Sequence, residues 1–225
     1  MKGYRLQVTV YSFLLFVLLS TVNCTLYPIY AQAPIESGQD IGSSRLSPEN
    51  PLYFLKPVRE ILEIKFAGTE KVRILKRLEF AERRLREVNS LIIAKREDLV
   101  APNMEKFLLE INLLKPVPDV RLPLVSVSLG RYMEILVSLY NNTTDPKAKL
   151  GIRSIVYRVM DFNNSYYMNM DPGLAIKLFP LQSAKFATGC SLLASESLNT
   201  SLNESERQIL KERGEKCKQA LLILQ

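Results

Sequence analysis

Hydrophobic and polar residues follow a helical period along much of this 225-residue chain. The pattern is plainest between Thr69 and Arg96, where apolar residues recur at alternating steps of four and three. That spacing places them on one face of a helix. Thr69 stands where an N-cap is expected, so the pattern predicts a long amphipathic helix that begins there. The residues of this face are Ile74, Leu78, Ala81, Leu85, Val88 and Ile92.

Capping signals predict further helices on both sides. Asn50 followed by Pro51 is an N-cap with proline at the first helical position. Pro57, about two turns on, is expected to kink or restart that helix, and Gly68 separates it from the long one. Later helices are predicted from Pro102 to Leu114, from about Pro123 to Tyr140, after Asp145–Pro146, after Asp171–Pro172–Gly173, and from the capping box Ser201–Leu202–Asn203–Glu204 through Leu221.

The later helices have apolar stripes of their own, which are the candidate core. No segment alternates with the period of two that a strand would need. We therefore predict an all-α fold, a single bundle of about six to seven helices. The stripes are Leu129, Tyr132, Met133, Leu136 and Tyr140; Ile152, Ile155, Val156, Val159 and Met160; and Ala184, Phe186, Ala187, Leu192 and Leu193.

The first thirty residues have the pattern of an export signal. Lys2 and Arg5 precede a stretch without charge that lasts until Glu36 and has an apolar centre. Cleavage after Ala31 fits the small-residue rule, but the uncharged stretch is also long enough to cross a hydrocarbon core of about 30 Å as an uncleaved anchor. Cys24 does not fit a lipoprotein signal, because asparagine precedes it. Either outcome predicts an extracytoplasmic protein, secreted or anchored to the outer face of the cytoplasmic membrane.

Composition divides the chain into three parts. Residues 1–31 are the signal peptide or membrane anchor, residues 32–49 are a Ser-, Gly- and Pro-containing flexible tether, and residues 50–225 are the helical domain. The net charge is +7, from 30 basic and 23 acidic residues, and loss of Lys2 and Arg5 leaves 28 against 23, or +5. The charges are interleaved, so a nucleic acid partner is not implied. The expected partners are an envelope protein or polymer, and the membrane through the N-terminal segment if it is uncleaved.

The sequence lacks most of the residues and motifs that indicate catalysis. The chain has no histidine, no Gly-rich phosphate loop and no Gly-x-Ser-x-Gly elbow. We therefore predict no catalytic residue, no cofactor and no metal. Three weaker patterns could each indicate a site, but each also has a simpler structural interpretation: surface charges, helix caps and core packing, respectively. They are the carboxylate pairs Glu60 with Glu63 and Glu79 with Glu82; a cation site of Asp161, Asn163 and Asn164; and an apolar pocket of Tyr166, Tyr167, Met168 and Met170.

Cys190 and Cys217 form an even pair in an oxidising compartment, one on each of the last two predicted helices. A disulfide there would add about 3 kcal/mol in the chain-entropy model. Against it, the two cysteines are staggered by about 12 Å in an ideal hairpin, given a rise of about 1.5 Å per residue. A disulfide and two buried thiols both remain open interpretations.

Two segments carry a resemblance. The run Ser47–Lys56 contains Pro-Leu-Tyr-Phe-Leu-Lys, and Ala81–Glu87 reads Ala-Glu-Arg-Arg-Leu-Arg-Glu. Together they resemble a bacterial domain of unknown function with P-L-Y-x-L-K and A-E-R-R-L-x-E motifs, over about residues 50–100. The resemblance implies an extracytoplasmic helical domain, and it supplies no reaction and no ligand.

The functional prediction is a non-enzymatic binding or interaction module of the bacterial cell envelope. Glu79 with Arg83 and Glu82 with Arg86 are spaced for ion pairs on a helix surface, which fits a solvated face as well as a partner surface. The alternatives are an envelope enzyme with a carboxylate site and an extracytoplasmic sensor of a small apolar ligand. The predicted interaction surface consists of Tyr53, Phe54, Arg83, Arg84 and Arg86.

Overall fold

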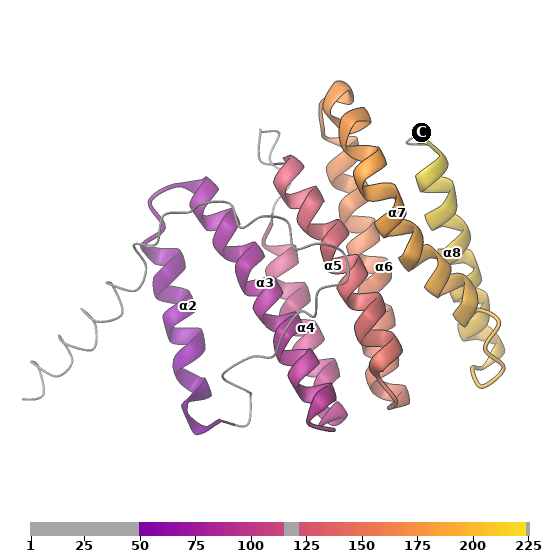
Figure 1. Cartoon of the computed structure of the whole chain (residues 1–225), viewed down its shortest axis with the longest axis horizontal. Helices are drawn as coiled ribbons and strands as arrows, with labels where there is room; N and C mark the ends of the chain where they lie inside the picture. Colours follow the sequence, from indigo (N-terminus) through magenta and orange to yellow (C-terminus); the bar gives the residue numbers. More distant parts are fainter. Residues whose placement is uncertain (1–49, 115–121, 224–225) are drawn as a thin grey trace, which may run out of the picture. The chain divides into compact units, whose positions relative to one another are not determined.

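The computed structural model describes residues 50–114 and 122–223 (Figure 1). All of these residues belong to one compact unit, Ile41–Gln225. The described residues form helices and turns and contain no strand, which confirms the all-α prediction. The predicted signal peptide or anchor (1–31), Cys24 and the predicted tether (32–49) lie outside the described residues.

Seven α-helices and two short 3-10 helices make up the described part of the chain. No helix among them is long and apolar enough to cross a membrane. In chain order the elements are η1 (Pro51–Phe54), α2 (Leu55–Lys65), α3 (Glu70–Ile93), η2 (Glu97–Leu99), α4 (Val100–Asn112), α5 (Leu122–Asn142), α6 (Pro146–Met168), α7 (Pro172–Glu196) and α8 (Glu204–Ile223).

Side-chain caps define where several helices begin. The hydroxyl of Thr69 accepts the Val72 N–H at 3.3 Å, and the carboxylate of Asp145 accepts the Ala148 N–H at 2.7 Å. Asp171 caps α7 in the same way. The caps at Thr69 and Asp145 were predicted, because a cap depends only on residues three apart in the chain. For α7 the prediction was only that a helix follows Asp171–Pro172–Gly173.

The start of α8 differs from the prediction by two residues. The capping box is formed by Asn203 and Glu206, not by Ser201 and Glu204. The Glu206 N–H donates to Asn203 Oδ1 at 2.8 Å, and the Asn203 N–H donates to Glu206 Oε2 at 3.3 Å. Two overlapping sequences satisfy the capping-box pattern here, and the turn formed at Asn199 leaves the second one at the helix entrance.

The first helical segment was predicted to kink or restart at Pro57, and the structure shows a restart two residues earlier. Residues 51–54 form the 3-10 helix η1, and the α-helix α2 starts only at Leu55. Pro57 is therefore the third residue of α2, where a backbone N–H has no partner inside the helix. The proline fits the first turn without distortion.

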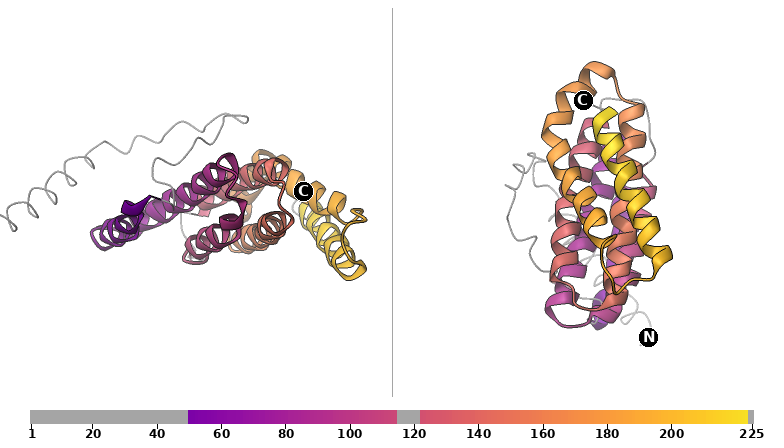
Figure 2. Two further views of the ribbon diagram at one scale, coloured as in Figure 1. Left: turned by 90° about the horizontal axis from the view of Figure 1, so that it is seen from below. Right: turned by 90° about the vertical axis from the view of Figure 1, so that its right-hand side faces the viewer.

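The apolar stripes of α3 to α7 meet in a common core. α3 packs on α4 and α5, α4 and α5 pack on α6, and α5 also packs on α7 (Figures 1 and 2). Ala184 is the exception among the predicted core residues, because it is exposed on α7. Gly189 allows the close approach of α7 to α5, since a Cβ there would lie 2.4 Å from Met133 Sδ. Fully buried core residues include Leu85, Val88, Phe107, Leu129, Leu136, Ile152, Ile155 and Val159.

The helices at the two ends of the described chain are less embedded. α8 packs mainly on α7, and these two helices lie side by side in Figures 1 and 2. Among the described elements, α2 packs only on η1 and α3. The helix α2 therefore has one covered face and one open face.

Candidate functional site

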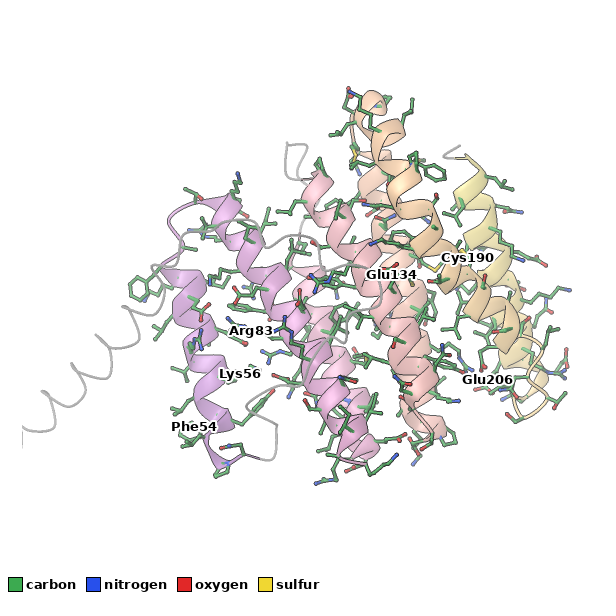
Figure 3. The ribbon with its side chains drawn as sticks, in the orientation of Figure 1. Phe54, Lys56, Arg83, Glu134, Cys190 and Glu206 are labelled. Atoms are coloured by element: carbon green, nitrogen blue, oxygen red, sulfur yellow. A yellow bond between two sulfur atoms is a disulfide. The ribbon has the colours of Figure 1, made fainter. Side chains whose placement is uncertain are left out.

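α2 turns three of its five charged side chains toward α3 and most of its apolar side chains away from it. Lys56, Glu60 and Glu63 are all shielded, and each makes an ion pair with a residue of α3. Figure 3 shows Lys56 and Arg83 in the space between α2 and α3. An amphipathic helix packed on a globular domain ordinarily has the opposite orientation. We call this the inverted orientation of α2, and it defines the candidate site.

The centre of the interface is a set of five residues that we call the α2–α3 ionic cluster: Tyr53, Lys56, Glu60, Arg84 and Glu87. Arg84 is only 5% exposed and pairs with Glu60 and with Glu87, the latter at 3.0 Å. The Tyr53 hydroxyl donates to Glu87 Oε2 at 2.9 Å, and Lys56 pairs with Glu87 Oε1. Every charge in the cluster therefore has an opposite charge beside it, which buried charges require.

The cluster extends to α4 through the ring of Tyr53. The ammonium groups of Lys56 and Lys106 lie 5.8 and 5.3 Å from the centre of that ring. Cations at this distance are attracted to the face of an aromatic ring. Tyr53 thus joins η1, α3 and α4 at the point where α2 begins.

A second group of charges continues the interface toward the end of α2. Lys76 pairs with Glu63 at 3.0 Å and with Glu79 at 3.1 Å. Arg83 lies 3.7 Å from both Glu60 and Glu63, and it also pairs with Glu79. Contacts at 3.7 Å between partly exposed groups stabilise weakly. This second group orients α2 more than it attaches it.

Burial sets the ionisation of the cluster. Loss of hydration raises the pKa of the Glu60 carboxyl, although the positive charge of Arg84 opposes that shift. Burial and the negative charge of Glu87 raise the pKa of the Tyr53 hydroxyl, so this group stays protonated and donates its hydrogen bond. Each acid of the cluster is paired with a cation of the other helix or of its own.

The open side of η1 and α2 is a set of large apolar side chains that we call the α2 apolar face. Its most exposed members are Phe66 at 77%, Ile61 at 66% and Phe54 at 65%. Phe54 is labelled in Figure 3, beside the start of α2. A contiguous exposed face of this kind marks an interaction site more often than scattered exposed residues do. The full set is Leu52, Phe54, Leu55, Val58, Ile61, Leu62 and Phe66.

The predicted interaction residues separate into different environments. Phe54 is exposed, whereas Arg84 is buried in the ionic cluster and is not part of any surface, contrary to the prediction. Tyr53 and Arg83 are partly shielded between α2 and α3, and Arg86 is paired with Glu82 at 2.5 Å. The sequence did not reveal these environments, because charges at the spacing seen along α3 occur both on a solvent-exposed helix face and on a face covered by another helix.

Each carboxylate of the two predicted pairs lies beside a cation. Glu60 and Glu63 each face arginine or lysine side chains of α3, as described above. Glu79 pairs with Lys76 and Arg83, and Glu82 pairs with Arg131 at 3.1 Å. Within the part of the chain that the structure describes, no three acidic, cysteine or histidine side chains converge as a metal site would require.

The predicted cation site is not assembled. Asp161 is exposed and pairs with Arg213 at 3.2 Å, whereas Asn163 is buried and lies 2.9 Å from the Ser126 hydroxyl. Asn164 lines a recess between α6, α7 and α8 with about 10 Å³ of free space. That space is close to the volume needed for one water molecule.

The four predicted pocket residues do not line one pocket. Tyr166 is buried and donates its hydroxyl hydrogen to the Leu114 carbonyl, and Met170 belongs to the core. Tyr167 borders the recess near Asn164, and Met168 is exposed. The core-packing interpretation therefore describes Tyr166 and Met170 better than the pocket interpretation does.

Cys190 of α7 and Cys217 of α8 are joined by a disulfide, with their Cα atoms 5.5 Å apart. The predicted stagger is reduced by the connection between the helices. After Glu196 the chain continues through tight turns, in which Leu198 and Asn199 donate to carbonyls three residues back. The Cα–Cα distance of 5.5 Å shows that the two helices do not keep the register of the ideal hairpin.

Sequence comparisons place the candidate site inside a known but uncharacterised domain. Residues 45–116 match the model of the Domain of unknown function (DUF5667). That match contains the ionic cluster, the α2 apolar face and the helices η1 to α4. No curated protein and no solved structure matches the chain. The uncharacterised domain predicted from residues 50–100 is therefore found, and its bacterial origin stays a prediction.

The two runs of residues that carry the resemblance contribute to the same cluster. Tyr53 and Lys56 come from the Pro-Leu-Tyr-Phe-Leu-Lys run, and Arg84 and Glu87 come from the Ala-Glu-Arg-Arg-Leu-Arg-Glu run. All four meet in the ionic cluster. In this chain, the two runs therefore supply most of the side chains that attach α2 to α3.

Proposed function

We propose that the protein is a non-enzymatic, extracytoplasmic binding module of the cell envelope that uses the α2 apolar face as its interaction surface. The observation that carries this proposal is the inverted orientation of α2. Burying charges is costly unless they are well paired, whereas burying apolar side chains is favourable. A helix that buries its charges and exposes its apolar residues is therefore suited to a second contact on that open face.

The proposed location has two supports. The N-terminal residues have the composition of a signal peptide or anchor. The Cys190–Cys217 disulfide is of the kind that persists in oxidising compartments and is rare where thiols are kept reduced. The disulfide lies on α7 and α8, outside the matched domain, so it supports the location independently of the resemblance.

Site-specific photo-crosslinking in cells tests the proposal. The photoreactive residue benzoylphenylalanine replaces Ile61 in the full chain, and the same residue replaces Ile93 as the control. The two isoleucines are matched, with exposed fractions of 66% and 65%, but Ile93 lies at the end of α3, away from α2. We expect adducts with protein or lipid at position 61 and none at position 93. Equal, background labelling at both positions would contradict the proposal.

A further inference from the structure

We propose that the partner of the α2 apolar face is the surface of an anionic lipid bilayer, on which α2 lies in the plane of the interface. This inference rests on the proposed function and names its partner. It depends on three features: the charges that remain exposed on α2, the shape of the exposed face, and the position of α2 in the chain.

The exposed charges of α2 are all positive. Its acids, Glu60 and Glu63, are turned toward α3. Arg59 lies at the edge of the apolar face and exposes 61% of its side chain, even though it bonds to Glu63. Lys65 is exposed in the last turn. Apolar residues flanked by cations are the composition of helices that bind the boundary between lipid headgroups and acyl chains.

The shape of the face suits a bilayer better than a peptide. The α2 apolar face is the outer side of a single helix that packs on α3 alone. Two recesses among the described residues lie elsewhere, lined by α6, α7 and α8. A bilayer needs no groove, because a helix buries its apolar side between the lipid headgroups.

An uncleaved N-terminal anchor would hold α2 near a membrane, because of the position of α2 in the chain. η1 and α2 begin directly after residues 1–49, whose uncharged run is long enough to serve as an anchor. A flexible chain of 18 residues, the length of the predicted tether 32–49, has an end-to-end distance of about 23 Å. A domain held at that distance meets the bilayer at a high effective concentration.

The ionic cluster lets α2 bind lipid without unfolding. Its charges are already paired against α3, on the side of α2 that faces away from the open surface. When the apolar side enters the interface, none of these charges has to enter hydrocarbon. The cost of burying ions in lipid is thereby avoided.

Tryptophan fluorescence tests the inference, because the chain contains no tryptophan. Phe66→Trp places the probe on the α2 apolar face, and Leu198→Trp places a matched probe in the turn between α7 and α8. The two positions are 77% and 78% exposed. Each full-length variant is measured alone, with phosphatidylglycerol vesicles and with phosphatidylcholine vesicles.

We expect phosphatidylglycerol vesicles to shift the emission of Phe66→Trp to the blue and to leave Leu198→Trp unchanged. Added salt and the changes Arg59→Gln with Lys65→Gln should reduce the shift, and phosphatidylcholine should give a smaller one. Lipids brominated in their acyl chains should quench Phe66→Trp alone. Insertion of the N-terminal segment by itself would change neither probe.

Two results would overturn the lipid inference. One is an unchanged Phe66→Trp spectrum with phosphatidylglycerol vesicles. The other is a blue shift that grows with protein concentration in the absence of vesicles, which would identify a second copy of the chain as the partner. Protein adducts at position 61 in cells, together with either result, would retain the proposed function and reject only the lipid partner. Absence of any adduct at position 61 would reject the proposed function itself.

Discussion

The α2–α3 interface and the α4–α5–α6 core join helices by different means. The core is assembled from apolar stripes, in which residues such as Leu136 and Ile155 are completely buried. At the α2–α3 interface, Glu60, Arg84 and Glu87 occupy the shielded positions, and the apolar residues of α2 face outward. The first arrangement maximises burial of apolar area. The second attaches a helix and leaves its apolar side free.

The two arrangements differ in how they respond to disturbance. A core of close-packed apolar residues loses stability when any member is shortened. A buried ionic cluster contributes little net stability while it is complete, but it becomes unfavourable when one charge is removed. We therefore expect α2 to behave as a separately detachable element whose attachment depends on a few charged residues.

The largest expected effect comes from shortening the same residue type in the two regions. Ile155→Ala should reduce the free energy of unfolding by about 2–5 kcal/mol, because it leaves a cavity. Ile61→Ala removes an exposed side chain and should change that free energy by less than about 0.5 kcal/mol. Denaturant unfolding of both variants measures the difference. Equal losses would show that the outer side of α2 is covered.

The disulfide gives the next largest effect and should leave α2 untouched. Replacing both Cys190 and Cys217 with serine frees a loop of 27 residues and should cost about 3 kcal/mol of stability. Amide exchange in α2 should stay the same as in the parent chain. Faster exchange in α2 would show that the two ends of the described chain are coupled, contrary to the expectation.

Removing the central charge should detach α2 selectively. Arg84→Gln removes the cation that Glu60 and Glu87 share, and leaves only Lys56 beside Glu87 and Arg83 at 3.7 Å from Glu60. Breaking a buried ion pair costs about 3–5 kcal/mol when a structure cannot relax. Release of α2 lets both acids reach water, so we expect a loss below about 3 kcal/mol. Hydrogen-exchange mass spectrometry should show lost protection in α2 only. The control is Arg73→Gln, whose side chain is half exposed and should leave α2 protected.

Glu97 is a buried acid outside the ionic cluster, and it can be compared with the acids of the cluster. The Glu97 carboxylate accepts hydrogen bonds from the backbone N–H of Asp145 and from the N–H and hydroxyl of Thr144. These hydrogen bonds, the one from Asp145 foremost, lower the pKa of Glu97. A lowered pKa means that the ionised group stabilises the fold above about pH 4.5 and that this contribution is lost as the pH falls through the native pKa.

Glu97→Gln should therefore cost about 1–2 kcal/mol at neutral pH. The gap between the variant and the parent chain should narrow as the solution is acidified below pH 4.5. Unfolding curves recorded at a series of pH values measure this gap. A gap that does not change with pH would show that Glu97 acts through its shape and not through its charge.

The smallest expected effect is at the end of α3. Lys95 has φ of 60°, and the N–H groups of Lys95 and Arg96 donate to the carbonyls of Ile92 and Leu91. This Schellman motif ordinarily has glycine in the position of Lys95. Lys95→Gly should raise stability by about 0.5–1 kcal/mol, because the left-handed conformation strains a side chain. Lys71→Gly, in the first turn of α3, is the control and should lower stability.

Local features of the fold were accessible from sequence, and the inverted helix was not. The caps at Thr69 and Asp145 depend on neighbouring residues and were predicted. The apolar residues of α2 have the spacing of a core-facing stripe, and the charges of α3 have the spacing of a solvated face. In the structure the apolar face of α2 is exposed and the charged face of α3 is covered. This reversal arises from the long-range pairing of Glu60 and Arg84, which no local pattern reveals.

The orientation of α2 is tested most directly by hydroxyl-radical footprinting of the full chain in detergent-free buffer. Three isoleucines share the same intrinsic reactivity: Ile61 on α2, Ile93 exposed at the end of α3, and Ile155 in the core. Mass spectrometry gives the oxidation rate of each. We predict that Ile61 reacts as fast as Ile93 and much faster than Ile155. An Ile61 as slow as Ile155 would contradict the inverted orientation, and with it the proposed interaction surface.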